Sequence, residues 1–411
     1  MKLEPTTLVL FGITGDLSQK KILPALYDMY KKSILPKDFS IVGFSRREFT
    51  NEEIKNFVVK DLKGTLNPEF LEKFSYVQGD FDDPSSYIKL GKHLSDIDKA
   101  HGGCTNKLFY LSTPPNFYER IALNISDVGL SIPCGGEDGF TRILLEKPFG
   151  KDLDTAKELD VLLEKLFKEE QIYRIDHYLA KESLHKIIDL YRRDETLSSK
   201  WTKEYIKEVN IKVYEKSKVG NRGNFYDGVG ALRDVGQNHI LQMLALVAMD
   251  IPKDNNPKNI QKSRADILRK LKPLDFKKDK IEEGQYEGYL SEPGVSKDSK
   301  TETFFRLTAY LNDPRFECVP FVLSSGKALC ANVTEIVVVF KDGLRVVFSV
   351  PREDSLPAYE RILLDCIAGD QTVFISTGEV LAEWGFISPI EENLKNITPF
   401  IYKEGMNPEG N

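Results

Sequence analysis

Apolar residues follow two different patterns in the two halves of the chain. From about residue 7 to residue 167, short continuous apolar runs alternate with segments in which apolar residues recur every three or four positions. The first pattern is typical of buried strands and the second of amphipathic helices. Strands are expected at 7–12, 39–44, 74–81, 107–115 and 141–150, and helices after the first strand as far as Tyr30, at 51–62, 85–97 and 152–167. Repeated strand–helix units predict a parallel, doubly wound sheet with right-handed crossovers.

The second half mixes helices and strands without this regular alternation. Helices are expected around 181–193 and 234–249, and strands at 208–215 and 303–311. The stretch "EIVVVFKDGLRVVFSV" (335–350) predicts a hairpin that turns at Asp342-Gly343, a strong two-residue turn signal. Two polar stretches, 252–280 and 291–300, are expected to be surface insertions. This half is therefore expected to be an α+β domain with a mainly antiparallel sheet.

Composition and charge narrow the class of protein. The chain has 411 residues, 41% of them hydrophobic and 29% charged, with a net charge of −6. This length predicts two domains, and an acidic balance argues against nucleic acid as the main partner, although a local basic pocket for one phosphate remains compatible with it. No apolar run of about 20 residues predicts a membrane span. The five cysteines, at positions 104, 134, 318, 330 and 366, are scattered and lack zinc-ligand spacing. We therefore expect a cytoplasmic protein without a metal site.

A glycine-containing turn follows the first expected strand. In "FGITGDLSQKK" (11–21), Gly12 and Gly15 stand where a strand passes into a helix. Glycines at such a turn let backbone N–H groups approach a pyrophosphate at the helix N-terminus. The third glycine of the usual dinucleotide motif is missing, so a plain tight turn is the alternative. With the first interpretation, residues 1–175 form a Rossmann-like dinucleotide-binding domain and residues 176–411 the α+β domain.

Two arginines follow the second expected strand. Folds that bind NAD usually place an acidic residue there, which holds the ribose 2′-hydroxyl, whereas an arginine suits the 2′-phosphate of NADP. The sequence is "GFSRRE", with Arg46 and Arg47. Guanidinium groups bind phosphate through paired hydrogen bonds, so NADP is favoured and NAD is expected to bind more weakly. The alternative is an exposed arginine pair at a strand end.

The stretch "RIDHYLAKE" (174–182) gathers polar side chains at the expected domain junction. Ligand sites of doubly wound proteins lie beyond the carboxyl ends of their strands. His177, Tyr178 and Lys181 could meet at one phosphate if a turn brings Lys181 back beside His177. Asp176 would then face another partner. The alternative is a solvated helix start capped by Asp176.

A second histidine lies on the apolar helix expected around 234–249. This helix carries Asp234, Gln237, Asn238 and His239 near its start. A histidine on an apolar helix is more often a core residue than a catalyst. Because the polar residues at 234, 238 and 239 share one face region, a wall of a cleft is the competing interpretation.

Together these motifs closely resemble the signature set of the glucose-6-phosphate dehydrogenase family. The resemblance rests on "FGITGDLSQKK", "EKPFG" (146–150), "RIDHYLAKE" and "RDVGQNHILQ", and runs in order from about Thr7 to Tyr402. Three further stretches match the family: "GQY" (284–286), "VPF…SGKAL" (319–329) and "LPAYERILLD" (356–365). The resemblance implies oxidation of glucose 6-phosphate to 6-phosphoglucono-1,5-lactone with hydride transfer to NADP, the first oxidative step of the pentose phosphate pathway. It also implies that residues 176–411 bind substrate and dimerise.

The resemblance implies roles for individual residues. His239 would be the general base and Asp176 the carboxylate that orients it. The residues implied in substrate binding are Lys147, His177, Tyr178, Lys181, Glu215, Asp234 and Lys327. Those implied in coenzyme binding are Gly12, Thr14, Gly15, Asp16, Leu17, Lys21, Arg46, Tyr118 and Lys147. Pro148 resembles a hinge proline that is sometimes cis in the family.

The chain departs from the family pattern at three places. Ala180 stands where glycine is usual, and Asn332 stands where a second basic sugar contact is often found. Between Phe340 and Pro357 the chain is much shorter than is normal for the family. Since that stretch contributes to the dimer sheet and, in some members, to a second NADP site, we expect a weak homodimer or a monomer with one NADP.

Two other functions are compatible with parts of this pattern. Other Rossmann-fold sugar oxidoreductases also use an "EKP" lysine but lack the HYLxKE cluster, so they would prefer an unphosphorylated sugar. A non-catalytic, NADP-sensing homologue would be expected to have lost His239, Asp176 or Lys147, and all three are present.

Overall fold

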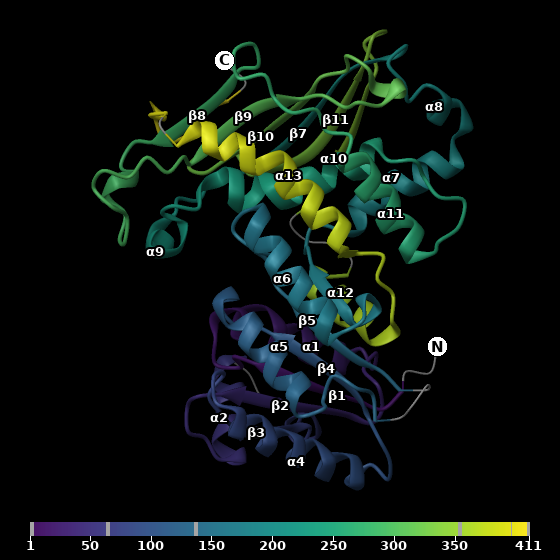
Figure 1. The fold of residues 1–411 in the computed structure, drawn as a ribbon, viewed down its shortest axis with the longest axis vertical. Helices are drawn as coiled ribbons and strands as arrows, with labels where there is room; N and C mark the ends of the chain where they lie inside the picture. Colours follow the sequence, from purple (N-terminus) through teal and green to yellow (C-terminus); the bar gives the residue numbers. More distant parts are fainter. Residues whose placement is uncertain (1–3, 63–65, 135–138, 352–355, 396, 409–411) are drawn as a thin grey trace. The chain divides into compact units, whose positions relative to one another are not determined.

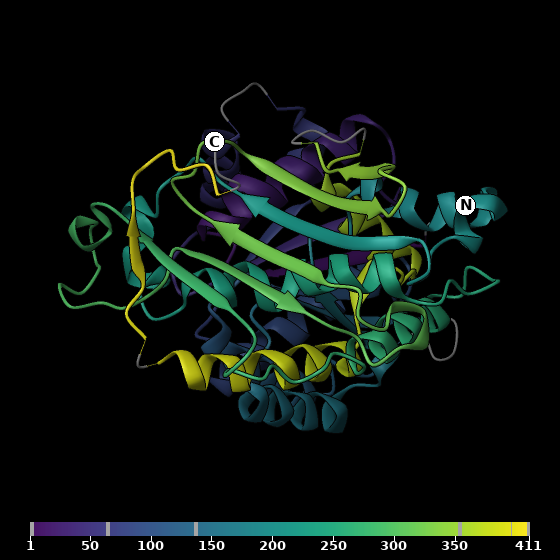
Figure 2. The same cartoon turned by 90° about the horizontal axis from the view of Figure 1, so that it is seen from above.

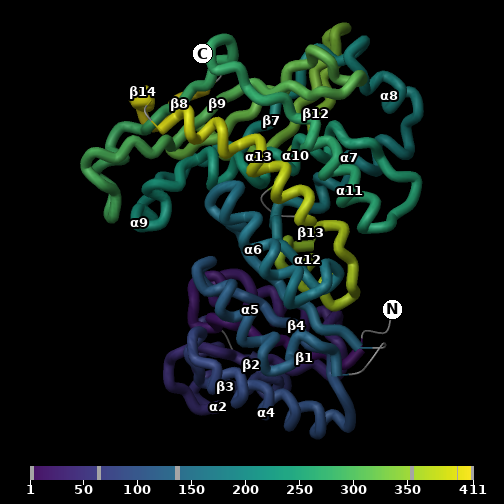
Figure 3. Tube along the Cα trace, viewed as in Figure 1, coloured from purple at the N-terminus to yellow at the C-terminus, as the bar shows by residue number. Residues whose placement is uncertain are grey.

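The computed structural model describes residues 4–62, 66–134, 139–351, 356–395 and 397–408. The chain divides into two compact units. The first unit comprises Met1–Gly150, Asp154–Ala180 and Leu356–Ile375, and the second comprises Lys151–Leu153, Lys181–Ser355 and Ser376–Asn411. The sequence-based boundary at 175/176 therefore differs from these units, chiefly because 356–375 return to the first. Their return can be followed in Figure 3, where α12 (Ala358–Ala368) and β13 (Phe374–Ile375) lie within that unit.

The first unit is built on a seven-stranded sheet in the order β13-β6-β5-β4-β1-β2-β3 (Figure 1). All neighbouring strands are parallel except β13, which pairs antiparallel with β6. The predicted doubly wound parallel sheet is confirmed. Its other strands are β1 (Thr6–Phe11), β2 (Phe39–Ser45), β3 (Phe74–Gln78), β4 (Asn106–Leu111), β5 (Thr141–Leu145) and β6 (Ile172–Ile175).

The helices of the first unit largely follow the expected positions. They are η1 (Ser18–Ile22), α1 (Leu23–Lys31), α2 (Asn51–Asp61), α3 (Pro68–Leu71), α4 (Pro84–Ala100), η2 (Pro115–Phe117), α5 (Tyr118–Asp127), α6 (Leu153–Leu166), η4 (Glu169–Gln171) and α12. Local signals explain two starts: Thr50 and Glu53 form a capping box before α2, and the Asp83 side chain accepts from the backbone of Ser85 before α4. The sequence analysis did not predict α5 or the short strand β6.

Aromatic packing fills the first unit between its sheet and helices. The Phe11 ring lies 4.9 Å from that of Phe44 and 6.0 Å from that of Tyr87, measured between centroids. Strands β1 and β4 are buried along their whole length. Burial on both faces explains why these strands appear in the sequence as continuous apolar runs. Because the strands themselves are covered, polar residues stand at the strand ends, where ligand sites of this fold form.

The second unit contains a seven-stranded sheet in the order β12-β11-β7-β10-β9-β8-β14, whose strands lie side by side in Figure 2. The pairs β7–β10 and β8–β14 are parallel and the others antiparallel, as predicted for a mainly antiparallel sheet. Its strands are β7 (Ile206–Tyr214), β8 (Ile281–Tyr286), β9 (Phe304–Ala309), β10 (Phe321–Gly326), β11 (Val333–Phe340), β12 (Arg345–Ser349) and β14 (Phe400–Tyr402).

The helices of the second unit include those expected around 181–193 and 234–249. They are α7 (Glu182–Arg193), α8 (Glu195–Ser199), η5 (Gly220–Arg222), α9 (Gly223–Tyr226), η6 (Leu232–Ile240), α10 (Leu241–Ala248), α11 (Pro257–Leu268), η7 (Tyr289–Ser291), η8 (Pro314–Phe316) and α13 (Thr377–Leu394). The helical segment η6 packs against β7 and β10, and α11 packs against α10 and α13. No helix among the described residues is long and apolar enough to cross a membrane.

The expectation that 252–280 is a surface insertion is wrong for its central part. Helix α11 is a core element, with Ile260, Ile267 and Leu268 buried. Its Arg264 is also buried, and Arg264 Nε lies 2.6 Å from Glu379 Oε1 of α13, which is buried as well. The sequence analysis missed this helix because its composition is polar. Arg264 can be buried because Glu379 neutralises its charge.

The predicted hairpin at 335–350 is confirmed as β11 and β12. Its loop is longer than the expected two-residue turn, because the Phe340 N–H donates to the Leu344 carbonyl across Lys341–Gly343 at 2.8 Å. Gly343 has a φ of 92°, a value that glycine adopts without strain in three-residue loops. Residues 352–355, which belong to the shortened stretch, lie outside the described part of the chain.

Candidate active site

The predicted glycine turn lies at the carboxyl end of β1, between β4 and β2. Gly12 has a φ of +76°, and a Cβ added there would lie 2.5 Å from the Ser112 carbonyl oxygen at the end of β4. The Ser18 hydroxyl donates to the Gly12 carbonyl at 2.9 Å, and Ser18 Oγ lies 3.0 Å from Ser112 Oγ. Only glycine fits this close approach, and the turn stands where the order of parallel strands reverses, the usual position of a nucleotide.

The other residues predicted from this motif lie at the start of the following helix. The Gly15 N–H donates to the Gly12 carbonyl at 2.8 Å, which closes the turn. Asp16 and Lys20 are exposed and form an ion pair of 2.5 Å, and Lys21 is exposed as well. Thr14 and Leu17 are partly buried beside them. The helix start therefore presents backbone N–H groups and Lys21 near the carboxyl end of β1.

Arg46 lies at this edge too. The Gly12 N–H donates to the Phe44 carbonyl at 2.8 Å, so Arg46 follows two residues after a direct partner of the glycine turn. Its side chain is exposed, just beyond the end of β2. The Tyr76 hydroxyl holds the backbone around it by donating to the Ser45 carbonyl at 2.9 Å. A cation on this fixed backbone is suited to an anionic group next to the turn.

Lys147 follows β5 at the carboxyl edge and is partly buried. The peptide bond from Lys147 to Pro148 is cis. Its neighbour Glu146 is buried and accepts a hydrogen bond from the Tyr110 hydroxyl at 2.7 Å. The Tyr118 hydroxyl donates to the Glu146 carbonyl at 2.8 Å, and Tyr118 is only 1% exposed. The coenzyme contact predicted for Tyr118 stays a prediction, since the structure places this hydroxyl in the core.

Glu146 is a titratable residue that the sequence analysis missed. Burial raises the pKa of its carboxyl group to about 7, and the negative charge of Asp176 acts in the same direction. The Tyr110 hydroxyl and the Lys147 ammonium oppose this rise. The signal in the sequence was weak: an acidic residue that directly continues a buried apolar run, in "RILLEKP".

We expect Glu146 to make folding dependent on pH. Because the folded protein binds its proton more tightly than the unfolded chain, where the pKa is near 4.5, this carboxyl destabilises the fold as pH rises from about 4.5 through about 7. The Glu146→Gln variant should therefore gain stability relative to the wild type across that window, by on the order of 3 kcal/mol. Urea unfolding at pH 5 and at pH 8 measures the gain, and the exposed Glu52→Gln variant is the control. An equal difference at both pH values would contradict this assignment.

Asp176, His177 and Tyr178 follow β6 at the same carboxyl edge. Asp176 is buried, and its Oδ1 accepts from the Tyr178 N–H at 2.8 Å. The His177 ring is partly exposed, 6.4 Å from the Tyr359 ring and nearly parallel to it. Helix α7 begins only at Glu182, so the alternative of a solvated helix start capped by Asp176 is wrong. Lys181 opens the second unit at the N-cap of α7, where its Nζ donates to the Pro351 carbonyl at 3.4 Å.

Glu215 and Lys327 form an ion pair in the second unit. They follow β7 and β10, which are adjacent and parallel, so the two strand ends meet. Lys327 is buried and its Nζ lies 5.4 Å from the centre of the Tyr226 ring. The side-chain carbonyl of Asn332 accepts from the Lys216 N–H at 3.0 Å. Asn332 thus holds the backbone beside Glu215.

Asp234 and His239 lie on η6, a segment of π-helix that is often found at functional sites. His239 is 2% exposed, and its backbone N–H donates to Asn238 Oδ1 at 2.7 Å. Asp234 is partly buried. Glu302, which sequence reasoning also missed, holds the start of η6 by accepting from the Leu232 N–H at 2.9 Å. Burial raises the pKa of this carboxyl group to about 8.

Comparisons with known proteins cover almost the whole chain. The family description "Glucose-6-phosphate dehydrogenase, NAD binding domain" matches residues 9–186, and the corresponding C-terminal domain matches residues 192–356 and 344–410. The glucose-6-phosphate 1-dehydrogenase of Chlamydia muridarum is 33% identical over 465 aligned positions, covering 96% of this chain and 91% of that protein. Because the alignment is longer than the 411 residues here, the relative carries residues that this chain lacks.

Solved structures agree with these matches. A glucose-6-phosphate dehydrogenase in complex with its substrate glucose-6-phosphate has a TM-score of 0.89 at 28% identity, covering 100% of this chain and 97% of the other. The glucose-6-phosphate 1-dehydrogenase of Mycobacterium avium has a TM-score of 0.86 at 29% identity, covering 98% and 95%. The chain therefore belongs to the glucose-6-phosphate dehydrogenase family.

Proposed function

We propose that this protein is an NADP-dependent glucose-6-phosphate dehydrogenase, which oxidises glucose 6-phosphate to 6-phosphoglucono-1,5-lactone. One observation carries the proposal: the family match spans both domains in order, and the residues implied in its chemistry are all present. The structure of each unit supports it, because Gly12, Arg46, Lys147, Asp176 and His177 follow strands of the first sheet, Glu215 and Lys327 follow strands of the second, and Asp234 and His239 lie on η6.

The coenzyme would occupy the carboxyl edge of the first unit. The residues fit such a group, since the turn at Gly12 has no room for a Cβ and exposes backbone at a helix start. Arg46 and Lys21 would hold phosphates, and Lys147 would lie between sugar and coenzyme. When bound, NADP supplies an acceptor for the hydride from C1 of the sugar.

The proposed chemistry needs one proton acceptor. His239 takes the proton of the C1 hydroxyl, and Asp176 orients the imidazole and stabilises its protonated form. His177, Tyr178 and Lys181 bind the phosphate, whose two negative charges match cationic and hydroxyl donors. Glu215, Asp234 and Lys327 hold the sugar hydroxyls. The ion pair between Glu215 and Lys327 supports this, because each side chain holds the other in place.

The test is an absorbance assay of nicotinamide reduction with the purified chain. Reduction of NADP that depends on glucose 6-phosphate is the expected result. A preference for an unphosphorylated sugar would instead favour the other Rossmann-fold sugar oxidoreductases. Binding of NADP without turnover on either sugar would favour a non-catalytic sensor.

Coenzyme preference should depend on Arg46. Charge-assisted hydrogen bonds are worth about 1.5–3 kcal/mol each, or roughly 10- to 150-fold in binding. Arg46→Ala should therefore weaken NADP by that factor and leave NAD nearly unchanged, as titration calorimetry can measure. Arg120→Ala, an exposed arginine of α5, is the control. Equal losses for both coenzymes would rule out a 2′-phosphate contact.

We further propose that the subunit interface is reduced and that each chain binds one NADP. Beyond β11 the sheet ends in the five-residue strand β12, where Val347 is 48% exposed. Stable dimers usually bury well over roughly 1,000 Å² in total, and fewer strands give less area. Sedimentation from nanomolar to micromolar concentration should show a monomer or a dissociating dimer. A dimer that persists at nanomolar concentration would mean that the remaining strands suffice.

A cytoplasmic location and a small-molecule substrate complete the proposal. All five cysteines are free thiols, and the net charge of −6 does not favour nucleic acid.

A further inference from the structure

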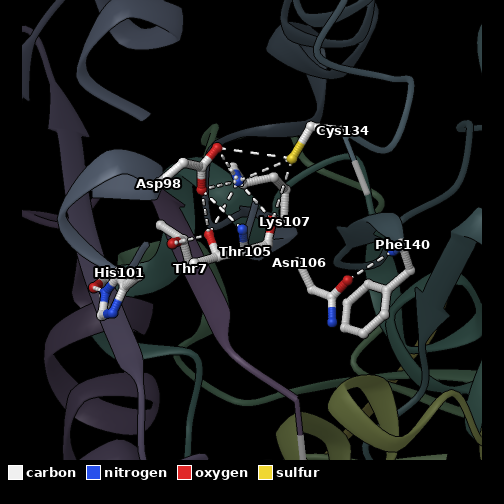
Figure 4. Close-up of polar contacts among 9 residues, drawn as sticks. Thr7, Asp98, His101, Thr105, Asn106, Lys107, Cys134 and Phe140 are labelled. Atoms are coloured by element: carbon white, nitrogen blue, oxygen red, sulfur yellow. Dashed lines mark hydrogen bonds and ion pairs between the residues drawn. The ribbon is translucent and has the colours of Figure 1, made fainter. Parts of the chain in front are cut away.

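A cluster of polar and sulfur-containing side chains lies at the amino ends of the parallel strands in the first unit. It is formed by Asp98, Cys104, Lys107 and Cys134, most of which Figure 4 shows. Asp98 is on α4, Cys104 and Lys107 flank the start of β4, and Cys134 follows α5. The glycine turn that would bind coenzyme is at the carboxyl ends of the same strands, so this cluster belongs to the opposite edge of the sheet.

The two cysteines are neighbours in space although 30 residues separate them in the chain. Their sulfur atoms and one carboxylate oxygen of Asp98 all lie within 4.8 Å of one another. Both thiols are exposed. Cys134 Sγ lies 3.7 Å from Asp98 Oδ2, 3.8 Å from the Thr105 carbonyl and 3.9 Å from Lys107 Nζ. Neither the spacing nor any sequence motif indicated this pair.

Lys107 argues against a metal ion at this place. Its ammonium group is buried and donates to both oxygens of Asp98, at 2.8 and 3.0 Å, and to the Thr105 carbonyl at 2.6 Å. A cation bound to Asp98 and the two sulfurs would face this charge at close range and would have to displace its hydrogen bonds. The chemistry left to the two thiols is reaction with each other.

We propose that Cys104 and Cys134 form a reversible disulfide that links the loop before β4 to the segment after α5. A small-molecule disulfide is the oxidant. The Cys104 thiolate attacks one of its sulfurs and expels the first thiolate, which leaves a mixed disulfide. The Cys134 thiolate then attacks Cys104 Sγ and expels the second. Two protein thiols and one disulfide thus give one protein disulfide and two small thiols.

The surroundings of the pair set the order of these steps. Partial desolvation of the Cys134 thiol raises its pKa to about 12, helped by Cys104 and Asp98 and opposed by Lys107. Thiolate, and not thiol, is the nucleophile, so the raised pKa of Cys134 slows its attack and makes closure the slow step at neutral pH. Closure should become faster as pH rises toward that pKa.

The space beside the thiols admits such an oxidant. A groove of about 670 Å³ is lined by both cysteines and by several glycines without side chains, among them Gly91, Gly102, Gly103 and Gly129. A Cβ built on any of these four glycines meets nothing within 4 Å. Because the groove is at the edge remote from the glycine turn, the disulfide would act as a clamp on the first unit. It would stabilise the fold by restricting the unfolded chain and would leave turnover unchanged.

The test uses the full chain and oxidised glutathione. After incubation and removal of the oxidant, two of the five thiols should be lost, a peptide map should show Cys104 joined to Cys134, and dithiothreitol should restore both. The melting temperature should rise by several degrees and fall back on reduction. Cys134→Ser should stop at a glutathione adduct on Cys104. Cys318→Ser, which removes an exposed thiol outside the cluster, should form the link normally.

Three results would overturn the proposal. A stable glutathione adduct on wild-type Cys104 without cross-linking would mean that the sulfurs cannot close. Protection of both thiols from alkylation by zinc ions alone would assign the cluster to a metal. A cross-link to any other cysteine would mean that the observed neighbours do not react. The wild-type peptide map decides between these results even if a variant fails to fold, and none of them depends on the activity of the enzyme.

Discussion

Replacing His239 by asparagine should lower kcat by about 10²- to 10⁴-fold, the usual contribution of a general base. The imidazole is the group proposed to take the proton of the C1 hydroxyl. Asparagine keeps a polar side chain of smaller size in a buried position, so the binding of glucose 6-phosphate should change far less than turnover. Steady-state kinetics and direct titration of the sugar separate the two effects.

Two further variants test whether the loss of turnover comes from the proposed base. Asp176→Asn should give a smaller loss of the same kind, because the imidazole remains and only its orientation and charge stabilisation are lost. His101→Asn, at an exposed histidine whose ring contacts Ser40, is the matched control and should leave kcat unchanged. If the His239 variant keeps more than about a tenth of wild-type turnover, another residue is the base.

Free glucose should be a very poor substrate, with kcat/KM lower by several powers of ten than for glucose 6-phosphate. The proposed phosphate site supplies His177, Tyr178 and Lys181, which would remain without an anion when free glucose binds. Groups arranged for a dianion then lose their charge-assisted hydrogen bonds, and this loss of binding energy also lowers the rate. Comparable activity of the wild type on both sugars would refute the role of these residues.

Lysine variants of α7 locate this effect. Lys181→Ala should reduce the difference in kcat/KM between the two sugars, because it should lose activity on glucose 6-phosphate alone. Lys186→Ala removes an exposed lysine within α7 and should leave the difference in kcat/KM between the two sugars as it is. Equal losses from both variants would indicate general electrostatic attraction of the substrate instead of a phosphate site.

Much of the fold followed from local patterns in the sequence. Buried strands such as β1 and β4 appear as continuous apolar runs because both of their faces are covered. The turn at Gly12 could be predicted from the sequence because a close backbone approach permits only glycine. The family motifs were recognised because each is a short contiguous segment of the sequence.

Titration of buried groups could not be predicted from the sequence. Glu146 and Glu302 look like ordinary acidic residues, and only burial raises the pKa of each carboxyl group. Arg264 likewise looks like a surface residue until Glu379, more than a hundred residues away in the chain, is seen beside it. Burial depends on which other segments cover a residue, and that information is not local.

The sequence by itself determined the fold class, the strand ends that carry polar residues, and the family. Only the tertiary structure decided that residues 356–375 return to the first unit, where β13 pairs with β6, and that Cys104 lies beside Cys134. The physical reason is the same in both cases. Hydrophobic periodicity and turn chemistry act between residues close in the chain, whereas strand pairing and side-chain contact between distant segments arise from the packing of the whole unit.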